Sequence, residues 1–200
     1  MELVLASGNA GKLREIAAML DGLAISVRTQ ADFAVSAVEE TGTTFVENAI
    51  IKARHAARAS GRPALADDSG IAVDALGGAP GVYSARYAGR DASDAANLHK
   101  LLEATAHLPD AARGCRFVCV MVAMRDADDP LPVIATGIWP GQLLRAPRGD
   151  GGFGYDPIFE VPGHGCSSAE LPPALKNRLS HRGQALRALR AALESTDGWR

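Results

Sequence analysis

Long hydrophobic runs are absent from this sequence of 200 residues. The longest apolar run, from Phe117 to Met124, has eight residues, whereas a membrane-spanning helix needs about 20. The N-terminus carries acidic Glu2, and glycines and a lysine soon end its short apolar run, which is unlike a signal peptide. We therefore expect a cytoplasmic protein that does not associate with a membrane.

Cysteine and net charge are also scarce. The three cysteines form no Cys-x-x-Cys pair, and their odd number argues against a disulfide framework. The five histidines show no zinc-binding spacing. The formal net charge is only −2, so no overall basic field would attract DNA or RNA, and we expect no nucleic-acid partner.

The patterns that are present are those of an α/β protein. Hydrophobic residues make up 47% and charged residues 22% of the chain, as in an ordinary globular domain. A short apolar strand from Leu3 to Ala6, a glycine-rich loop from Ser7 to Lys12 and helical spacing from Leu13 to Leu20 form the opening of an α/β unit. No repeat or long linker divides the chain, so we expect a single domain spanning residues 1–200.

Similar patterns predict the later elements. Helices are expected from a capping box at Thr44 and Glu47, over Asp94 to Thr105, and from about His181 to Leu193. Strands are expected over Ala64 to Ala66, Ile71 to Ala75, Arg116 to Arg125 and Leu131 to Leu143.

The loop from Ser7 to Lys12 is the first candidate site. A glycine-rich loop before a helix presents free backbone N–H groups to a phosphate, and Lys12 adds a full positive charge. The sequence does not match a P-loop, because Ala6 and Leu13 stand where that motif needs Gly and Ser or Thr. An ordinary helix start capped by Asn9 remains the alternative.

Two pairs of carboxylates are candidate metal ligands. Asp67 and Asp68 follow the strand that is expected to end at Ala66, and Mg²⁺ is often held by one or two carboxylates together with substrate phosphates. A plain turn is the alternative, because Asp, Ser and Gly all favour turns. The pair Glu39 and Glu40 offers further ligands, although a solvated loop is the more common fate of such a pair.

Several cations and aromatic rings are candidate substrate contacts. Lys52 lies one helical turn from Asn48 and is placed to reach a phosphate. The stretch from Gly149 to Gly154 matches G-x-G-x-x-G, but prolines follow it where a dinucleotide motif needs a helix. Phe153 and Tyr155 are then either base-stacking residues or core residues.

Together, these segments resemble one family over nearly the whole chain, the inosine triphosphate pyrophosphatases, which act on non-standard purine nucleoside triphosphates. The segments that carry the resemblance are Ser7-Gly8-Asn9-Ala10-Gly11-Lys12, Glu39-Glu40-Thr41-Gly42 with Phe45-Val46-Glu47-Asn48-Ala49, Asp67-Asp68-Ser69-Gly70, Gly77-Gly78-Ala79-Pro80-Gly81 with Ser84-Ala85-Arg86-Tyr87, Gly152-Phe153-Gly154-Tyr155-Asp156-Pro157, and Ser180-His181-Arg182.

The resemblance implies a fold and an activity. The expected fold is an elongated mixed central sheet flanked by helices, in two lobes with an active-site cleft between them, and such proteins are usually homodimers. The expected reaction converts dITP, ITP or XTP with Mg²⁺ to the monophosphate and pyrophosphate, which cleanses the nucleotide pool.

The resemblance also implies residue roles. Asp68 is the expected proton acceptor and a Mg²⁺ ligand, Glu39 is the second metal carboxylate, and Ser69 contacts substrate. The triphosphate is expected to bind Ser7, Gly8, Asn9, Ala10, Gly11 and Lys12. The residues expected around the nucleoside are Phe153, Gly154, Tyr155, Asp156, Lys176, His181 and Arg182.

Three other functions remain open. A nucleotide sensor with the same phosphate-binding loop would release no product, and a nucleotidase cutting the γ-phosphate would release orthophosphate. A nucleic-acid binder using arginines near the C-terminus would lose affinity steeply with salt; those arginines are Arg178, Arg182, Arg187 and Arg190.

Overall fold

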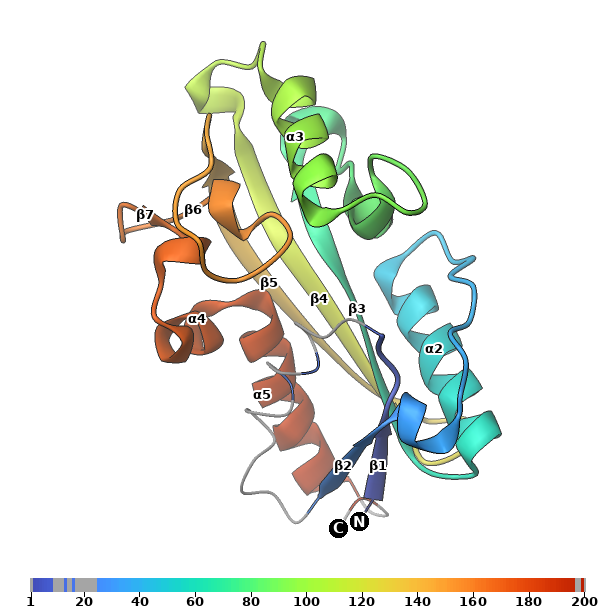
Figure 1. Cartoon of the computed structure of the whole chain (residues 1–200). Helices are drawn as coiled ribbons and strands as arrows, with labels where there is room; N and C mark the ends of the chain where they lie inside the picture. The colour runs from blue at the N-terminus through green and yellow to red at the C-terminus, as the bar shows by residue number, and fades with distance from the viewer. Residues whose placement is uncertain (1, 9–12, 14–15, 17–24, 197–198, 200) are drawn as a thin grey trace. The chain divides into compact units, whose positions relative to one another are not determined.

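The structure is a computed structural model that describes residues 2–8, 13, 16, 25–196 and 199. Seven strands form one sheet in the order β2-β1-β3-β4-β5-β6-β7. The strands are β1 (Glu2–Leu5), β2 (Ser26–Thr29), β3 (Ala64–Val73), β4 (Gly114–Met124), β5 (Val133–Leu143), β6 (Phe159–Val161) and β7 (Cys166–Ser167). The helices are α2 (Phe45–Ser60), α3 (Asp94–Thr105), α4 (Pro173–Leu179) and α5 (His181–Ser195) (Figure 1).

The sheet is mixed. Strand β1 pairs in parallel with β2 and with β3, and its residue Val4 lies opposite Ala64. Strand β6 pairs antiparallel with both β5 and β7. A mixed sheet with flanking helices confirms the expected fold class.

The chain forms two compact units. Unit 1 comprises Met1–Asp68, Cys119–Gly137 and Arg182–Arg200, and unit 2 comprises Ser69–Val118 and Ile138–His181. The active-site cleft expected from the sequence stays a prediction. Within the described residues, no helix is long and apolar enough to cross a membrane.

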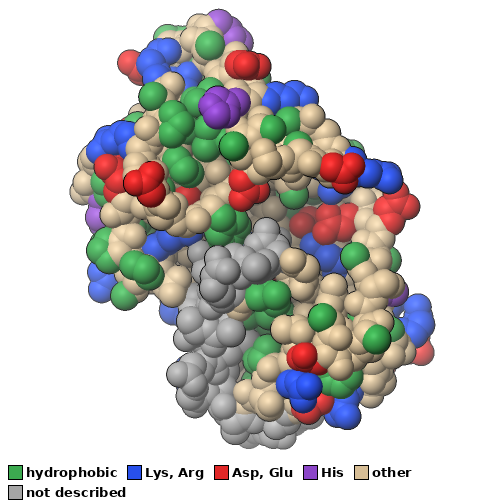
Figure 2. All heavy atoms as spheres, in the orientation of Figure 1, with side chains coloured by type: hydrophobic (Ala, Val, Ile, Leu, Met, Phe, Trp, Pro, Cys, Tyr) green, Lys and Arg blue, Asp and Glu red, His purple; other side chains and the backbone are tan. Residues whose placement is uncertain are grey.

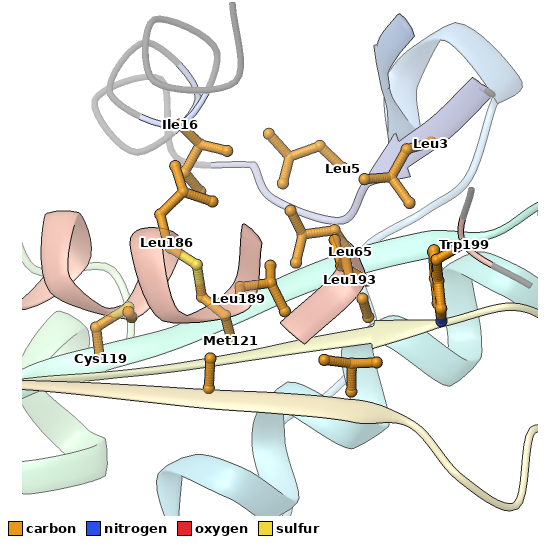
Figure 3. Close-up of a cluster of buried hydrophobic side chains, with 14 residues drawn as sticks. Leu3, Leu5, Ile16, Leu65, Cys119, Met121, Leu186, Leu189, Leu193 and Trp199 are labelled. Carbon is orange, nitrogen blue, oxygen red and sulfur yellow. The ribbon is translucent and has the colours of Figure 1, made fainter. Parts of the chain in front are cut away.

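The core of unit 1 lies between its sheet and α5. Leucines of α5 pack on side chains of β1, β3 and β4, together with Ile16 and Trp199 (Figure 3). The next residues along β4, Val120, Val122 and Met124, are buried on the opposite face. Both faces of the sheet are therefore covered in this unit, and α2 and α5 lie on opposite sides of its strands in Figure 1.

Local sequence explains where α2 begins and ends. Thr44 Oγ1 accepts from the backbone N–H of Glu47, and Glu47 accepts in return from the backbone N–H of Thr44, which confirms the predicted capping box. Gly61 ends the helix in the left-handed conformation, with φ of 65°. The buried stripe is narrow because it consists mainly of alanines, and these let the helix lie close to its neighbours.

One prediction about β3 was wrong. The sequence predicted that a short strand ends at Ala66, immediately before Asp67 and Asp68, but β3 continues unbroken to Val73. Asp67 and Asp68 are buried in mid-strand, with exposed fractions of 1% and 5%. Polar residues are tolerated there because partners from distant helices bind them, which no local pattern reveals.

The other predicted elements agree closely with the structure. Helices α3 and α5 and strands β4 and β5 lie within two residues of their expected bounds at most ends. A three-residue 3₁₀ helix (Asp156–Ile158) and then strand β6 follow the glycine-rich segment, whereas a dinucleotide motif needs an α-helix there, which agrees with the rejection of that motif. Helix α4 and the short strands β2, β6 and β7 were not predicted.

Candidate functional site: a buried acidic cluster in unit 1

Surface charge does not single out a site on the face shown in Figure 2, because basic and acidic side chains are interspersed there. Buried charge is more informative. Asp67 and Asp68 are neighbours in a strand, and successive side chains of a strand point to opposite faces. The two carboxylates therefore point to opposite faces of β3, although the charges of both raise the pKa of Lys52.

Asp68 is bound from α2 through both carboxylate oxygens. Lys52 Nζ lies 3.2 Å from Oδ1, and Asn48 Nδ2 donates to Oδ2 over 3.2 Å. Asn48 and Lys52 are one helical turn apart, so both side chains project from the same face of α2. The sequence placed these two residues on one face, and their shared partner confirms it.

The Lys52 ammonium is shared with a second carboxylate. Its Nζ lies 2.6 Å from Glu40 Oε1. Burial alone would lower the pKa of Lys52, but Asp68, Asp67 and Glu40 outweigh that effect, so the pKa is raised above the usual 10.5. Lys52 therefore stays fully charged at neutral pH.

The loop that carries Glu39 and Glu40 is fastened to α2 at several points. The backbone N–H of Gly42 donates to Asn48 Oδ1 over 2.9 Å, and His55 Nε2 lies 3.0 Å from the carbonyl of Ser36. Glu39 is exposed and Glu40 is half-buried. Glu40 shares Lys52 with Asp68, and the assignment of Glu39 as a metal ligand stays a prediction.

Asp67 faces a different set of groups. Arg182, at the start of α5, has its Nη2 3.6 Å from Asp67 Oδ2, and both side chains are almost fully buried. The thiol of Cys119 lies 4.0 Å from the same oxygen. All three cysteines are free thiols, as the sequence predicted.

The phosphate-binding loop expected from the sequence lies largely outside the described residues. Asn9, Ala10, Gly11 and Lys12 are not among them. Ser7 is half-buried and Gly8 is exposed, directly after β1. The role of this loop stays a prediction.

The cluster suits a divalent cation by the chemistry of its donors. Carboxylate oxygens are the ligands that Mg²⁺ prefers, and Asp68 and Glu40 share a single ammonium. Within the described residues, no group of three His, Cys, Asp or Glu side chains is close enough to hold a metal ion alone. That limit is compatible with Mg²⁺, which usually keeps several waters and binds substrate phosphates as well.

Predicted nucleoside contacts in unit 2

Four predicted substrate residues lie in one segment of unit 2, and Asp156 organises it. Its buried carboxylate accepts from Lys176 Nζ at 2.8 Å, Ser168 Oγ at 2.9 Å and the backbone N–H of Phe153 at 2.8 Å. A Cβ atom on Gly152 would lie 2.1 Å from the same carboxylate, so only glycine fits at that position.

The two aromatic residues of this segment have different environments. Tyr155 is buried in the core, and its hydroxyl donates to the carbonyl of Ser84 over 2.8 Å. Burial raises the pKa of this phenol well above 10. Phe153 is half-buried, with Lys176 Nζ 5.2 Å from its ring centroid. Of the two rings, Phe153 is the more exposed.

The remaining predicted residues of unit 2 are at least partly buried. The ring of His181 stacks on Phe117, with centroids 4.7 Å apart and planes 12° apart. Ser69 is half-buried in β3. Gly154 donates its backbone N–H to Asp94 Oδ2 over 2.9 Å, a contact from the start of α3 that the sequence gave no reason to expect.

Relatives of the chain

The fold and the buried groups describe an α/β protein with two carboxylates around one lysine in unit 1. The Ham1 family model matches residues 3–192, and the chain belongs to this family. A protein of Pseudomonas aeruginosa named dITP/XTP pyrophosphatase is 62% identical over 193 residues, 96% of either chain. A protein of Shigella flexneri with the same name is 57% identical over 97% of this chain and 98% of that one.

Solved structures agree with these relatives. A HAM1 protein from Coxiella burnetii has a TM-score of 0.91 and 52% identity, covering 98% of this chain and 100% of that one. A nucleoside-triphosphatase, also titled dITP/XTP pyrophosphatase, from Mycobacterium abscessus has a TM-score of 0.76 and 42% identity, covering 94% and 98%. The family expected from the sequence is therefore confirmed.

Proposed function

We propose that this protein hydrolyses the non-standard purine nucleoside triphosphates dITP, ITP and XTP to the monophosphate and pyrophosphate. Membership of the Ham1 family and the names of relatives at 57% and 62% identity support the activity. The observation that carries it is the buried Asp68, bound through both oxygens from one face of α2.

Asp68 is assigned the proton-accepting role. A water oxygen attacks the α-phosphorus, the bond from that phosphorus to the bridging oxygen breaks, and pyrophosphate leaves with the electron pair. The proton of the water passes to an oxygen of Asp68. Because a free Asp has a pKa near 3.9 and is a weak base at neutral pH, much of its contribution lies in holding the water in place.

Mg²⁺ is the proposed cofactor, held by Asp68 and Glu39, with Glu40 added because it shares Lys52 with Asp68. When bound, the ion neutralises charge on the phosphate oxygens. The permanently charged Lys52 adds to that electrostatic stabilisation. The loop from Ser7 to Lys12 is assigned to the triphosphate through its backbone N–H groups and the Lys12 ammonium.

Unit 2 and the start of α5 are assigned to the nucleoside. Arg182 and His181 supply donors that suit the O6 and N7 acceptors of a 6-oxo purine and disfavour the amino group of adenine. Phe153 is proposed to stack on the base, and Ser69 to contact substrate. The remaining assigned contacts are Gly154, Tyr155, Asp156 and Lys176.

The cellular setting completes the proposal. We propose a cytoplasmic homodimer that acts on free nucleotides and binds neither nucleic acid nor membrane. Gel filtration with light scattering gives the oligomeric state directly.

The deciding experiment measures both products of dITP with and without Mg²⁺. We expect dIMP and pyrophosphate in equal amounts, with turnover lost on chelation. Orthophosphate with dIDP would instead identify a nucleotidase that cuts the γ-phosphate, and binding without any product would identify a sensor.

A further inference from the structure

Asn48 is fully buried at the start of α2, and both ends of its amide are engaged. Its Nδ2 donates to Asp68 Oδ2 over 3.2 Å, and its Oδ1 accepts from the backbone N–H of Gly42 over 2.9 Å. A single side chain thus joins the carboxylate in β3 to the loop that carries Glu39 and Glu40.

The fit around this amide is close. A Cβ atom on Gly42 would lie 2.7 Å from Asn48 Oδ1 and 2.6 Å from Glu47 Cβ. Glu47 is itself fixed by the capping box with Thr44, which holds the first turn of α2 in place. The loop and the amide therefore have one mutual arrangement, and neither moves without disturbing the other.

We propose that Asn48 is a positioning residue for the reaction: it sets the orientation of the Asp68 carboxylate and ties it to the acidic loop. The inference rests on the proposed function, because it assigns a role within that site. Lys52 attracts Oδ1 by charge, which is tolerant of direction, whereas the amide of Asn48 donates to Oδ2 along a defined direction. Fixing both oxygens limits rotation of the carboxylate, and a displacement of about 1 Å in such a group costs on the order of 100-fold in rate.

The chain contains a matched control in unit 2. Asn97 is also a buried helical asparagine, and it uses both amide ends, accepting from the backbone N–H of Ala88 at 2.7 Å and donating to the carbonyl of Ala85 at 3.1 Å. All its partners are backbone groups and none is a carboxylate. Removing the amide of Asn97 should therefore cost about as much stability as removing the amide of Asn48, but it leaves the contacts of Asp68 unchanged.

The test compares Asn48→Ala with Asn97→Ala. We expect both variants to lose thermal stability to a similar extent, but only Asn48→Ala to lose kcat for dITP, by about 10–100-fold, with KM changed less than about threefold. Equal kcat in the two variants would overturn the inference. Absence of dITP turnover by the unaltered protein would overturn the proposed function instead.

A second variant approaches the same contact from the loop. Gly42→Ala keeps the asparagine at position 48 but places a methyl group against its Oδ1. Titration calorimetry with MgCl₂ alone then measures the affinity for the cation without turnover. We expect Gly42→Ala and Asn48→Ala each to weaken Mg²⁺ binding about 10-fold or more, and the double variant to be little worse than either. Unchanged Mg²⁺ affinity in both single variants, or a crystal structure of either with Asp68 oriented as here, would refute the positioning role.

Discussion

Each unit contains a lysine paired with a buried aspartate, and the two pairs differ in their other partners. In unit 1, the Lys52 ammonium is shared between Asp68 and Glu40. In unit 2, Asp156 accepts from Lys176, from a hydroxyl and from a backbone N–H. Two carboxylates around one ammonium suit the arrival of another cation, whereas three donors around one carboxylate suit a fixed loop. Residue types alone do not distinguish the two pairs, whereas the neighbours that the fold brings to each pair do.

The largest expected effect comes from Asp68→Asn. We expect kcat for dITP to fall by on the order of 1,000-fold, because both the proton acceptor and a metal ligand are lost. The free energy of unfolding should change by less than about 1 kcal/mol, since Lys52 keeps Glu40 as a partner. Turnover near that of the unaltered protein would remove Asp68 from the mechanism.

Asp156→Asn should instead have its main effect on the stability of the protein. It leaves the Lys176 ammonium buried without its carboxylate, so we expect a loss of about 3 kcal/mol in the free energy of unfolding. Urea unfolding of both Asp156→Asn and Asp68→Asn compares their free energies of unfolding directly. If Asp68→Asn proved the more destabilising of the two, the contrast between the pairs would be wrong.

Arg182→Ala tests the assignment of base reading. We expect the preference for dITP over dATP, as a ratio of kcat/KM values, to fall by about 10-fold, because a donor to O6 is lost. The ratio cancels any general damage from leaving Asp67 without this arginine. A preference that stays the same in the variant would exclude Arg182 from base reading.

The smallest expected effect involves neither pair and concerns the hairpin between β4 and β5. The hydrogen bonds from Arg125 hold the pKa of Asp129 well below its usual range. A carboxylate with a lowered native pKa stabilises the fold above its unfolded pKa of about 3.9 and loses that contribution as the pH falls through the native pKa. We expect Asp129→Asn to cost about 1 kcal/mol at pH 7 and progressively less below pH 4, as measured by thermal unfolding. A deficit of the same size at pH 7 and pH 2 would contradict this assignment.

The contrast between the pairs also explains what sequence patterns were able to predict. Helix α2 was foreseen because its capping box and terminal glycine are local signals. The continuous strand β3 was not, because Asp67 and Asp68 are stabilised in mid-strand by residues far away in the chain, among them Arg182, Asn48 and Lys52. The short strands β2, β6 and β7 and the seven-residue helix α4 are too short to show a period.

The same limit applied to the site. The motifs identified Asp68 as a candidate and placed Asn48 and Lys52 on one helical face. They named Glu39 as the second metal carboxylate, but they did not predict the bond between Glu40 and Lys52, because that bond depends on how the loop is fastened to α2. Distances across the fold decide such questions, and spacing along the sequence does not.

Asp67 and Asp68, which point to opposite faces of β3, also affect the register in which the strand pairs. Strand β3 is otherwise nearly uniform in hydrophobicity, and it pairs with β1 as Val4 to Ala64 and Leu5 to Leu65. A slip by one residue would exchange the faces of Asp67 and Asp68 and bury each among the wrong partners. The two charges therefore raise the free energy of misaligned strand pairings, which an all-apolar strand would tolerate.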